Sequence, residues 1–132
     1  MMVCFDTDIL VGLLRGDPNA KEKIKNFQDK GIEVSTTPIN ACELFKGAFK
    51  SAYPKENSDL VGSLLKNMKL LNFDIKSSKI IGEEMDRLRR RGDSLGEMDV
   101  MIAGMAIANN EILVTKNINH FKRIRNLRIE VW

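Results

Sequence analysis

Three acidic residues stand where an ionised carboxylate is costly. Asp6 directly follows an apolar run at 3–5, Glu43 lies in a mostly apolar segment, and Asp99 lies in a segment that is apolar on nearly every side. A helix that is apolar all round is a buried helix, and a buried carboxylate is stable only when it is paired or binds a metal. Because carboxylates that come together repel one another, we expect Asp6, Glu43 and Asp99 to share one divalent cation.

Each acid also has a simpler structural interpretation. Glu43 could pair with Lys46 three positions on, and Asp99 could be a first-turn acid that faces the helix dipole. Asp6 could be a helix N-cap, although Asp8 fits that role better. Taken together, the three acids favour the metal cluster, and ligation by oxygen alone favours Mg²⁺ or Mn²⁺ over zinc.

The other reactive side chains are scarce. The chain has one histidine, His120, which we interpret as a surface helix residue, and two cysteines, Cys4 and Cys42, which we interpret as reduced core residues. These are too few ligands for a structural zinc site. A nucleophilic triad would have to use His120, and no glycine-rich phosphate loop follows a strand.

Strands and helices alternate along the chain and must position these acids. The apolar runs predict strands at 3–5, 32–35, 70–73, 112–115 and 127–132, and helical spacing with capping residues predicts helices at 8–16, 18–30, 37–49, 58–67, 74–91, 97–108 and 118–124. This alternation favours an α/β fold with parallel strands and helices on both faces of the sheet. Ligands of such sheets bind at the carboxyl ends of the strands, where the first strand ends at Asp6 and the fourth at Thr115 and Asn117.

Length and charge limit the remaining possibilities. The 132 residues fit one domain, 1–132, and the net charge of +3 is only a mild bias towards polyanions. Asp6 and Asp8 interrupt the apolar start, so we expect no secretory leader. No apolar run approaches the roughly 18 residues that span a bilayer. We therefore expect a cytoplasmic protein with no membrane partner.

Four segments, taken in order, resemble the motifs of a PIN domain. The first is Asp6-Thr7-Asp8-Ile9-Leu10, and the others are 37–47, 96–103 and 113–117, the last followed by His120-Phe121. The likeness covers essentially the whole chain, and the wording of the first and third segments is most similar to VapC-type toxins of toxin–antitoxin pairs. It implies a PIN-like three-layer α/β/α domain with a central, mostly parallel sheet of four to five strands.

The resemblance also implies an activity, a metal-dependent endoribonuclease that hydrolyses RNA phosphodiesters. Asp6, Glu43 and Asp99 match the acidic ligands of the family, and Asn117 takes the place of a fourth acid that is often Asp. Asp8 is then a ligand or a group that orients a ligand, and the expected substrate-binding residues at the site are Thr7, Thr115 and Asn117.

By the same resemblance we expect two protein partners: a VapB-like antitoxin, whose C-terminal segment lies in an apolar groove, and a second copy in a homodimer. The candidate groove residues are Ile9, Leu13, Phe45, Phe49, Leu60 and Leu64, for which core packing is the alternative.

Four arginines end the helix predicted before Gly92, namely Arg87, Arg89, Arg90 and Arg91. A solvated last turn that complements the helix dipole is the simpler interpretation. The alternative is contact with RNA phosphates, which makes Arg90 and Arg91 candidate substrate-binding residues.

Two other functions stay open. One is a PIN nuclease of RNA processing or quality control. The other is a non-catalytic RNA-binding or assembly module with the same fold, which Asn117 favours and the complete set Asp6, Glu43 and Asp99 disfavours.

Overall fold

Five short parallel strands form the sheet of the computed structural model, which describes residues 2–132. They are β1 (Met2–Phe5), β2 (Glu33–Thr36), β3 (Lys69–Leu70), β4 (Ile112–Val114) and β5 (Ile129–Glu130), in the spatial order β3-β2-β1-β4-β5. Central β1 pairs with β2 in the register Val3↔Val34 and with β4 in the register Cys4↔Leu113. The chain thus builds the sheet outward on one side of β1 and then returns to build the other side. The switch point of this α/β sheet lies between β1 and β4.

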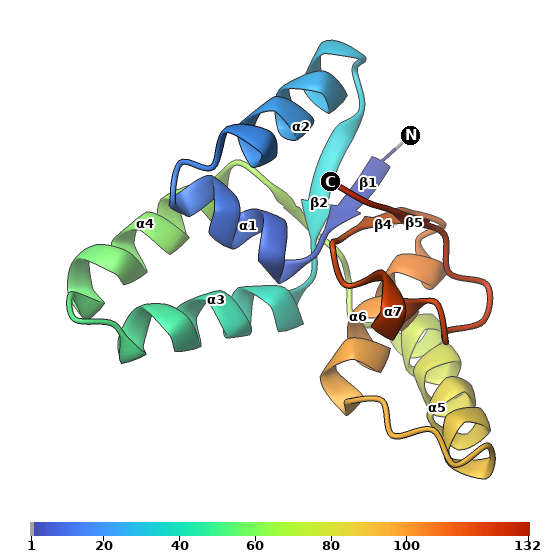
Figure 1. Cartoon of the computed structure of the whole chain (residues 1–132). Coiled ribbons are helices and arrows are strands. Elements are labelled where there is room, and N and C mark those ends of the chain that lie inside the picture. The colour runs from blue at the N-terminus through green and yellow to red at the C-terminus, as the bar shows by residue number, and fades with distance from the viewer. Residues whose placement is uncertain (1) are drawn as a thin grey trace.

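Seven helices of the described chain cover the two faces of the sheet (Figure 1). They are α1 (Thr7–Leu14), α2 (Pro18–Asp29), α3 (Pro38–Lys50), α4 (Pro54–Lys66), α5 (Ile75–Arg90), α6 (Glu97–Ala108) and α7 (Ile118–Phe121). Helices α1 to α4 lie on one side of the sheet and α5 to α7 on the other, which confirms the expected three-layer α/β/α arrangement.

The strand pleat divides the interior into two cores. Val3, Phe5 and Val114 point into the core under α1 to α4, whereas Cys4 and Leu113 point into the core under α5 to α7. Successive side chains of a strand face opposite sides, so runs that are apolar at every position fit a sheet covered on both faces.

Several predicted boundaries were wrong. Helix α4 begins at Pro54 and not at 58, because a proline without an N–H suits the first helical turn, as it also does in α2 and α3. Helix α1 begins at Thr7, with Asp6 at the N-cap position, so Asp8 is not the cap. Strands β3 and β5 and helix α7 are shorter than predicted, since only two residues of each strand pair with a neighbour and α7 makes a single turn.

The prediction that both cysteines are buried was half right. Both are free thiols, but Cys4 is buried and Cys42 is exposed. The core face of α3 carries Asn40, Leu44 and Ala48. Position 42 lies about half a turn away from that face, so the apolar neighbours of Cys42 did not indicate its burial. None of the described helices is long and apolar enough to cross a membrane.

A buried glutamate lies in the second core. Glu111 is 3% exposed, and its Oε1 is within hydrogen-bonding distance of Ser35 Oγ, which also lies 3.0 Å from the Val3 carbonyl oxygen. The single hydroxyl proton of Ser35 cannot serve two acceptors. Both contacts are satisfied when Glu111 is protonated and donates to Ser35, which then donates to Val3. Burial raises the pKa of Glu111 and favours the same protonated form, although the hydrogen bond from Ser35 opposes this rise.

Helices α5 and α6 pack so closely that glycine is required at their crossing. A Cβ added to Gly104 would overlap the side chain of Ile81 and lie 3.5 Å from the Ile81 Cα. A Cβ added to Gly82 on α5 would have no neighbouring atom within 4 Å. We expect Gly104→Ala to lower the free energy of unfolding by roughly 1–3 kcal/mol through overpacking, and Gly82→Ala, the matched control, to leave it unchanged or raise it. Urea titration followed by circular dichroism measures both, and equal effects would contradict the close packing.

The raised pKa of Glu111, which is hydrogen-bonded to Ser35, predicts how the stability of the protein depends on pH. Because the pKa of Glu111 is raised in the folded state, its contribution to stability is complete below the ordinary glutamate pKa and is lost as pH rises through the folded-state pKa. In Glu111→Gln the amide N–H can donate to Ser35 without a charge, so we expect unchanged or higher Tm at pH 7.5 and a smaller loss of Tm between pH 4.5 and 8. The exposed Glu22→Gln is the control. A Glu111→Gln protein with the pH profile of the unmodified protein would contradict the protonated form.

Candidate active site

Asp6 lies at the switch point of the sheet and is nearly buried. It is 7% exposed, and its backbone N–H donates to the Val114 carbonyl, which joins the end of β1 to the end of β4. Thr115 Oγ1 donates to Asp6 Oδ2 at 2.7 Å, and Asn40 Nδ2 donates to Asp6 Oδ1 at 3.1 Å. Both carboxylate oxygens therefore accept from a side chain on another element.

The electrostatic surroundings of Asp6 disfavour its ionised form. The pKa of Asp6 is raised to about 6: burial is the largest cause, the hydrogen bonds from Thr115 and from the Thr7 backbone oppose it, and the negative charges of Asp8 and Glu43 add to it. A carboxyl group that is buried beside two other acids becomes easier to ionise when a cation is bound.

Thr7 and Asn40 connect Asp6 to Glu43. The hydroxyl of Thr7 donates to Glu43 Oε1 at 2.8 Å and accepts from Asn40 Nδ2 at 2.9 Å. The start of α3 orients Asn40, because Thr37 Oγ1 lies 2.7 Å from Asn40 Oδ1 and accepts from the Asn40 backbone N–H. This capping box holds the amide oxygen and turns the NH₂ group towards Asp6 and Thr7.

Asp99 contacts a different partner. It lies in the first turn of α6, with a side chain that is 25% exposed, and its Oδ2 is 3.0 Å from His120 Nδ1. With Nδ1 protonated, His120 donates this hydrogen bond. Since α7 follows β4 directly, the contact places Asp99 beside the carboxyl end of β4. His120 was predicted to be a plain surface residue; it is half-exposed but bonded to a candidate ligand.

Asp8 accepts a hydrogen bond at each of its two carboxylate oxygens and lies close to the Thr115 hydroxyl. Trp132 Nε1 donates to Asp8 Oδ1 at 3.0 Å, the Lys116 backbone N–H donates to Oδ2 at 2.8 Å, and Thr115 Oγ1 lies 3.2 Å from Oδ2. Thr115 therefore stands between Asp6 and Asp8, with both carboxylates within reach of one hydroxyl.

Positive side chains are missing from this cluster. Within residues 2–132, no lysine or arginine forms an ion pair with Asp6, Asp8 or Glu43, and the considered pairing of Glu43 with Lys46 is absent. Carboxylate and hydroxyl oxygens without a cationic partner fit a hard divalent cation such as Mg²⁺ or Mn²⁺.

The acidic side chains of the site do not converge on one point in this structure. In the described chain, no group of three or more His, Cys, Asp or Glu side chains is arranged to hold a metal ion as the side chains stand. Glu43 is turned towards Thr7 and Asp99 towards His120, so a shared ion would require one or both to rotate. The sharing of a cation by Asp6, Glu43 and Asp99 stays a prediction.

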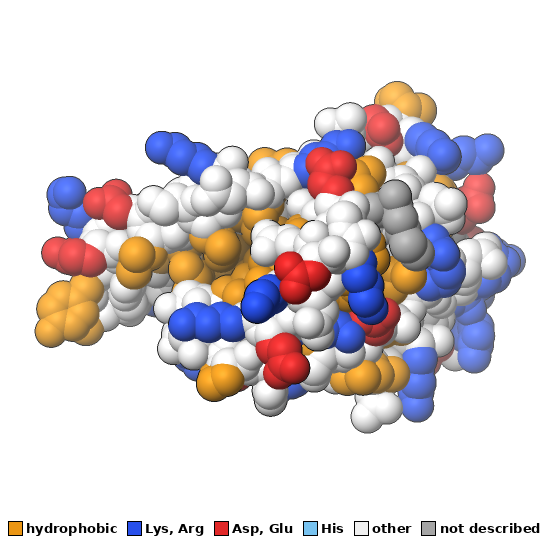
Figure 2. Space-filling view, turned by 90° about the horizontal axis from the view of Figure 1, so that it is seen from above, with side chains coloured by type: hydrophobic (Ala, Val, Ile, Leu, Met, Phe, Trp, Pro, Cys, Tyr) orange, Lys and Arg blue, Asp and Glu red, His pale blue; other side chains and the backbone are white. Residues whose placement is uncertain are grey.

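The remaining candidate residues contribute less directly. Asn117 is the N-cap of α7, but its side chain makes no capping hydrogen bond; its backbone N–H donates to Thr115 Oγ1 at 3.0 Å. Arg90 pairs with Asp86 at 3.0 Å and Arg91 lies 3.8 Å from Asp93 Oδ2, all at the far end of α5. Both arginines are exposed, and Figure 2 shows basic side chains along the edge of the molecule on the side of α5 to α7.

A groove runs between α1, α3 and α4 and reaches Glu43. Its volume is about 270 Å³, and its lining residues are Val11, Leu14, Arg15, Glu43, Leu44, Gly47, Ala48, Ser51, Asn57, Leu60 and Val61. Of the predicted groove residues only Leu60 lines it, because Ile9 is buried in the core and Phe49 is exposed beyond it. Figure 2 shows hydrophobic side chains in a recess on the half of the molecule formed by α1 to α4.

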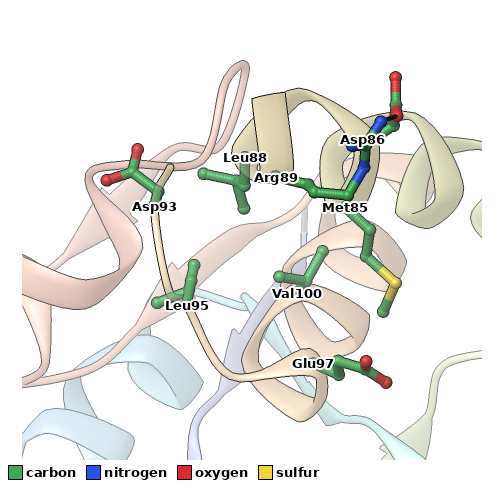
Figure 3. A pocket seen from close by; sticks show the side chains of 8 residues that line it. All are labelled: Met85, Asp86, Leu88, Arg89, Asp93, Leu95, Glu97 and Val100. Carbon is green, nitrogen blue, oxygen red and sulfur yellow. Dashed lines mark hydrogen bonds and ion pairs between the residues drawn. The ribbon is translucent and has the colours of Figure 1, made fainter. Parts of the chain in front are cut away.

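A larger cavity of about 440 Å³ lies away from the acidic cluster. It is formed by α5, the loop before α6 and the start of α6, and Figure 3 shows its apolar floor of Leu88, Leu95 and Val100. The charged side chains at its rim are Asp86, Arg89, Asp93 and Glu97. It contains none of the candidate site residues.

Two residues of the site were missed by the sequence. Asn40 was within a quoted motif without a role, although an Asn three residues after a capping Thr indicates a capping box. His120 was discounted because it lies in a polar stretch. Its hydrogen bond to Asp99, a residue 21 positions away in the sequence, becomes visible only in the folded structure.

Comparisons with known proteins identify the family that this chain resembles. The family model described as PIN domain matches residues 3–127. Ribonuclease VapC2 of Rickettsia felis is 32% identical over 132 residues, covering 100% of this chain and 98% of the relative. The tRNA(fMet)-specific endonuclease VapC of Salmonella typhimurium is 30% identical over 127 residues, covering 96% and 95%.

Solved structures give the same result. The chain superposes on a chain of VapBC2 from Rickettsia felis, a complex bound to a DNA fragment from its promoter, with a TM-score of 0.92, 31% identity and coverage of 100% and 99%. For DNA-bound VapBC from Salmonella typhimurium the TM-score is 0.90, with 28% identity and coverage of 100% and 99%.

The burial of Asp6 predicts a stability effect. In Asp6→Asn the amide oxygen can accept from Asn40 and the amide NH₂ can donate to Thr115, so the network stays satisfied without the charge. Since burial raises the pKa of Asp6, the ionised form is destabilising above that pKa, and removing the charge should raise the free energy of unfolding at pH 7.5 by roughly 1–3 kcal/mol. Thermal unfolding in EDTA measures the effect, with the exposed Asp59→Asn as control. A lower Tm for Asp6→Asn would show that the carboxylate is not strained.

Proposed function

The chain belongs to the PIN-domain family, and we propose that it is a divalent-metal-dependent endoribonuclease, the toxin of a type II toxin–antitoxin pair. One observation carries the proposal: Asp6, Asp8 and Glu43 gather at the switch point of the sheet with no lysine or arginine of residues 2–132 paired to them. The full-length likeness to ribonucleases named VapC supports the reaction class.

Asp6, Glu43 and Asp99 are the residues that would hold the cation, with Asp8 beside them. When bound, a cation of this kind polarises phosphoryl oxygens and lowers the pKa of an attacking water. A hard cation with oxygen ligands also neutralises the mutual repulsion of the acids, which is the reason that Mg²⁺ or Mn²⁺ suits this donor set.

The protein's own groups orient the acids. The NH₂ group of Asn40 and the hydroxyl of Thr115 hold the two oxygens of Asp6, and Thr7 holds Glu43, so the carboxylates stand in fixed directions before a substrate arrives. A preorganised polar site of this kind needs little rearrangement during the reaction. His120, bonded to Asp99, is placed to hold or release a proton at Nδ1 near the same edge.

Substrate contacts follow from position. Thr7, Thr115 and Asn117 lie around the acids, and the hydroxyls of Thr7 and Thr115 would have to turn away from Glu43 and Asp6 to donate to phosphate oxygens. Arg90 and Arg91 extend the positive surface along the end of α5. A relative named as specific for tRNA(fMet) supports a structured RNA as the substrate class.

A VapB-like antitoxin is the expected regulator. The similar solved chains come from VapBC complexes, and the groove between α1, α3 and α4 offers apolar walls that end at Glu43. A peptide segment in this groove would lie next to a candidate metal ligand. The homodimer, the single domain 1–132 and the cytoplasmic location stay predictions.

The function is tested with purified protein and total RNA in Mg²⁺, in Mn²⁺ and in excess EDTA, with new RNA ends mapped by sequencing. We expect cleavage only with metal, and a loss of at least 100-fold in rate for Asp99→Asn. Glu97→Gln, which changes an exposed acid of the same helix turn, is the matched control and should keep full rate. Cleavage that persists in EDTA, or an Asp99→Asn protein with normal rate and intact fold, would refute the proposal.

A further inference from the structure

Trp132 reaches from the end of the described chain into the acidic site. It follows β5, and its Nε1–H donates to Asp8 Oδ1 at 3.0 Å. Asp8 lies in the first turn of α1, 124 positions earlier in the sequence. This long-range hydrogen bond joins the last strand region to the first helix beside Asp6.

Three other groups contact the indole ring: the Lys116 ammonium, Gly12 and the apolar core. Lys116 Nζ lies 3.9 Å from the centroid of the ring, within the range of a cation–π interaction. Gly12 of α1 leaves just enough room for the ring, since a Cβ at this position would be 3.1 Å from Trp132 Cη2. The ring also packs against the apolar core under α1 to α4.

The other oxygen of Asp8 is held by the loop after β4. The Lys116 backbone N–H donates to Asp8 Oδ2 at 2.8 Å, and Thr115 Oγ1 lies 3.2 Å from the same oxygen. Lys116 thus acts twice, with its backbone on Asp8 and its ammonium group on Trp132. Asp8 is fixed by donors at both oxygens, whereas Glu43 accepts one hydrogen bond from Thr7.

We propose that Trp132 is a positioning residue of the metal site, which locks the Asp8 carboxylate in an outer place beside Asp6 and Thr115. The inference rests on the proposed function and assigns roles within it: Asp6, Glu43 and Asp99 hold the cation, and Asp8 adds negative charge while it stays bonded to Trp132 and to the Lys116 backbone. Outer partners that orient ligands typically change metal affinity by 10–100-fold when they are removed.

The test compares Mn²⁺ binding by isothermal titration calorimetry in the full chain and in Trp132→Phe, which keeps a ring against Gly12 but cannot donate to Asp8. We expect Trp132→Phe to weaken Mn²⁺ binding about tenfold while Tm in EDTA changes little. Lys116→Met, which removes the cation–π contact and keeps the backbone N–H, should weaken binding less. Trp132→Ala, which also removes the packing, should lower Tm.

A double-mutant cycle separates positioning from packing. If Trp132 acts through Asp8, Trp132→Phe has no further effect on Mn²⁺ affinity in an Asp8→Ala protein. Additive effects, or a Trp132→Phe protein with unchanged affinity, overturn the inference and leave the nuclease proposal intact. A protein that binds no Mn²⁺ and cuts no RNA overturns both.

The indole supplies a second readout, because Trp132 is the one tryptophan in the sequence. Intrinsic fluorescence excited at the indole band therefore reports on the surroundings of Trp132, which include Asp8. We expect Mn²⁺ to change the emission of the unmodified protein at the same concentrations that calorimetry gives, and not that of an Asp6→Asn protein. Emission that ignores the metal would contradict a Trp132 coupled to the site.

Discussion

The structure depends on placing the Asp6 carboxylate, 7% exposed, at the end of its central strand. A buried negative charge is unfavourable unless surrounding groups satisfy it, and here three elements do so: the loop after β4 with Thr115, the start of α3 with Asn40, and the start of α1 with the Thr7 backbone N–H. Because each of these groups comes from a different part of the chain, the sheet order that brings β4 beside β1 is also the condition for the site. The strand order of the sheet therefore determines both the fold and the position of the acidic site.

The arrangement combines rigid and movable acids. Asp6 and Asp8 are held at both oxygens, whereas Glu43 and Asp99 each make one side-chain contact, with Thr7 and His120. In the proposed site, the two fixed charges would attract the cation and the two adjustable ones would complete its coordination.

Much of this organisation could be predicted from the sequence. The α/β class, the order of the elements and the positions of Asp6 and Thr115 follow from apolar runs that end in polar residues, because strand ends at a switch point carry ligands in parallel sheets. Features that depend on three-dimensional packing could not be predicted. The side of α3 on which Cys42 lies, the start of α4 at Pro54, and the contact of His120 with Asp99 are set by neighbours that are distant in sequence. Short strands such as β3 also lack enough residues to give a reliable pattern.

The hydrogen bond between Asp8 and Trp132 has a consequence for synthesis of the protein in the cell. The ribosome releases the N-terminal strand and helix first, yet one of the donors that orients Asp8 is encoded 124 codons later. A nascent chain that has not yet exposed residue 132 therefore lacks the indole N–H that donates to Asp8.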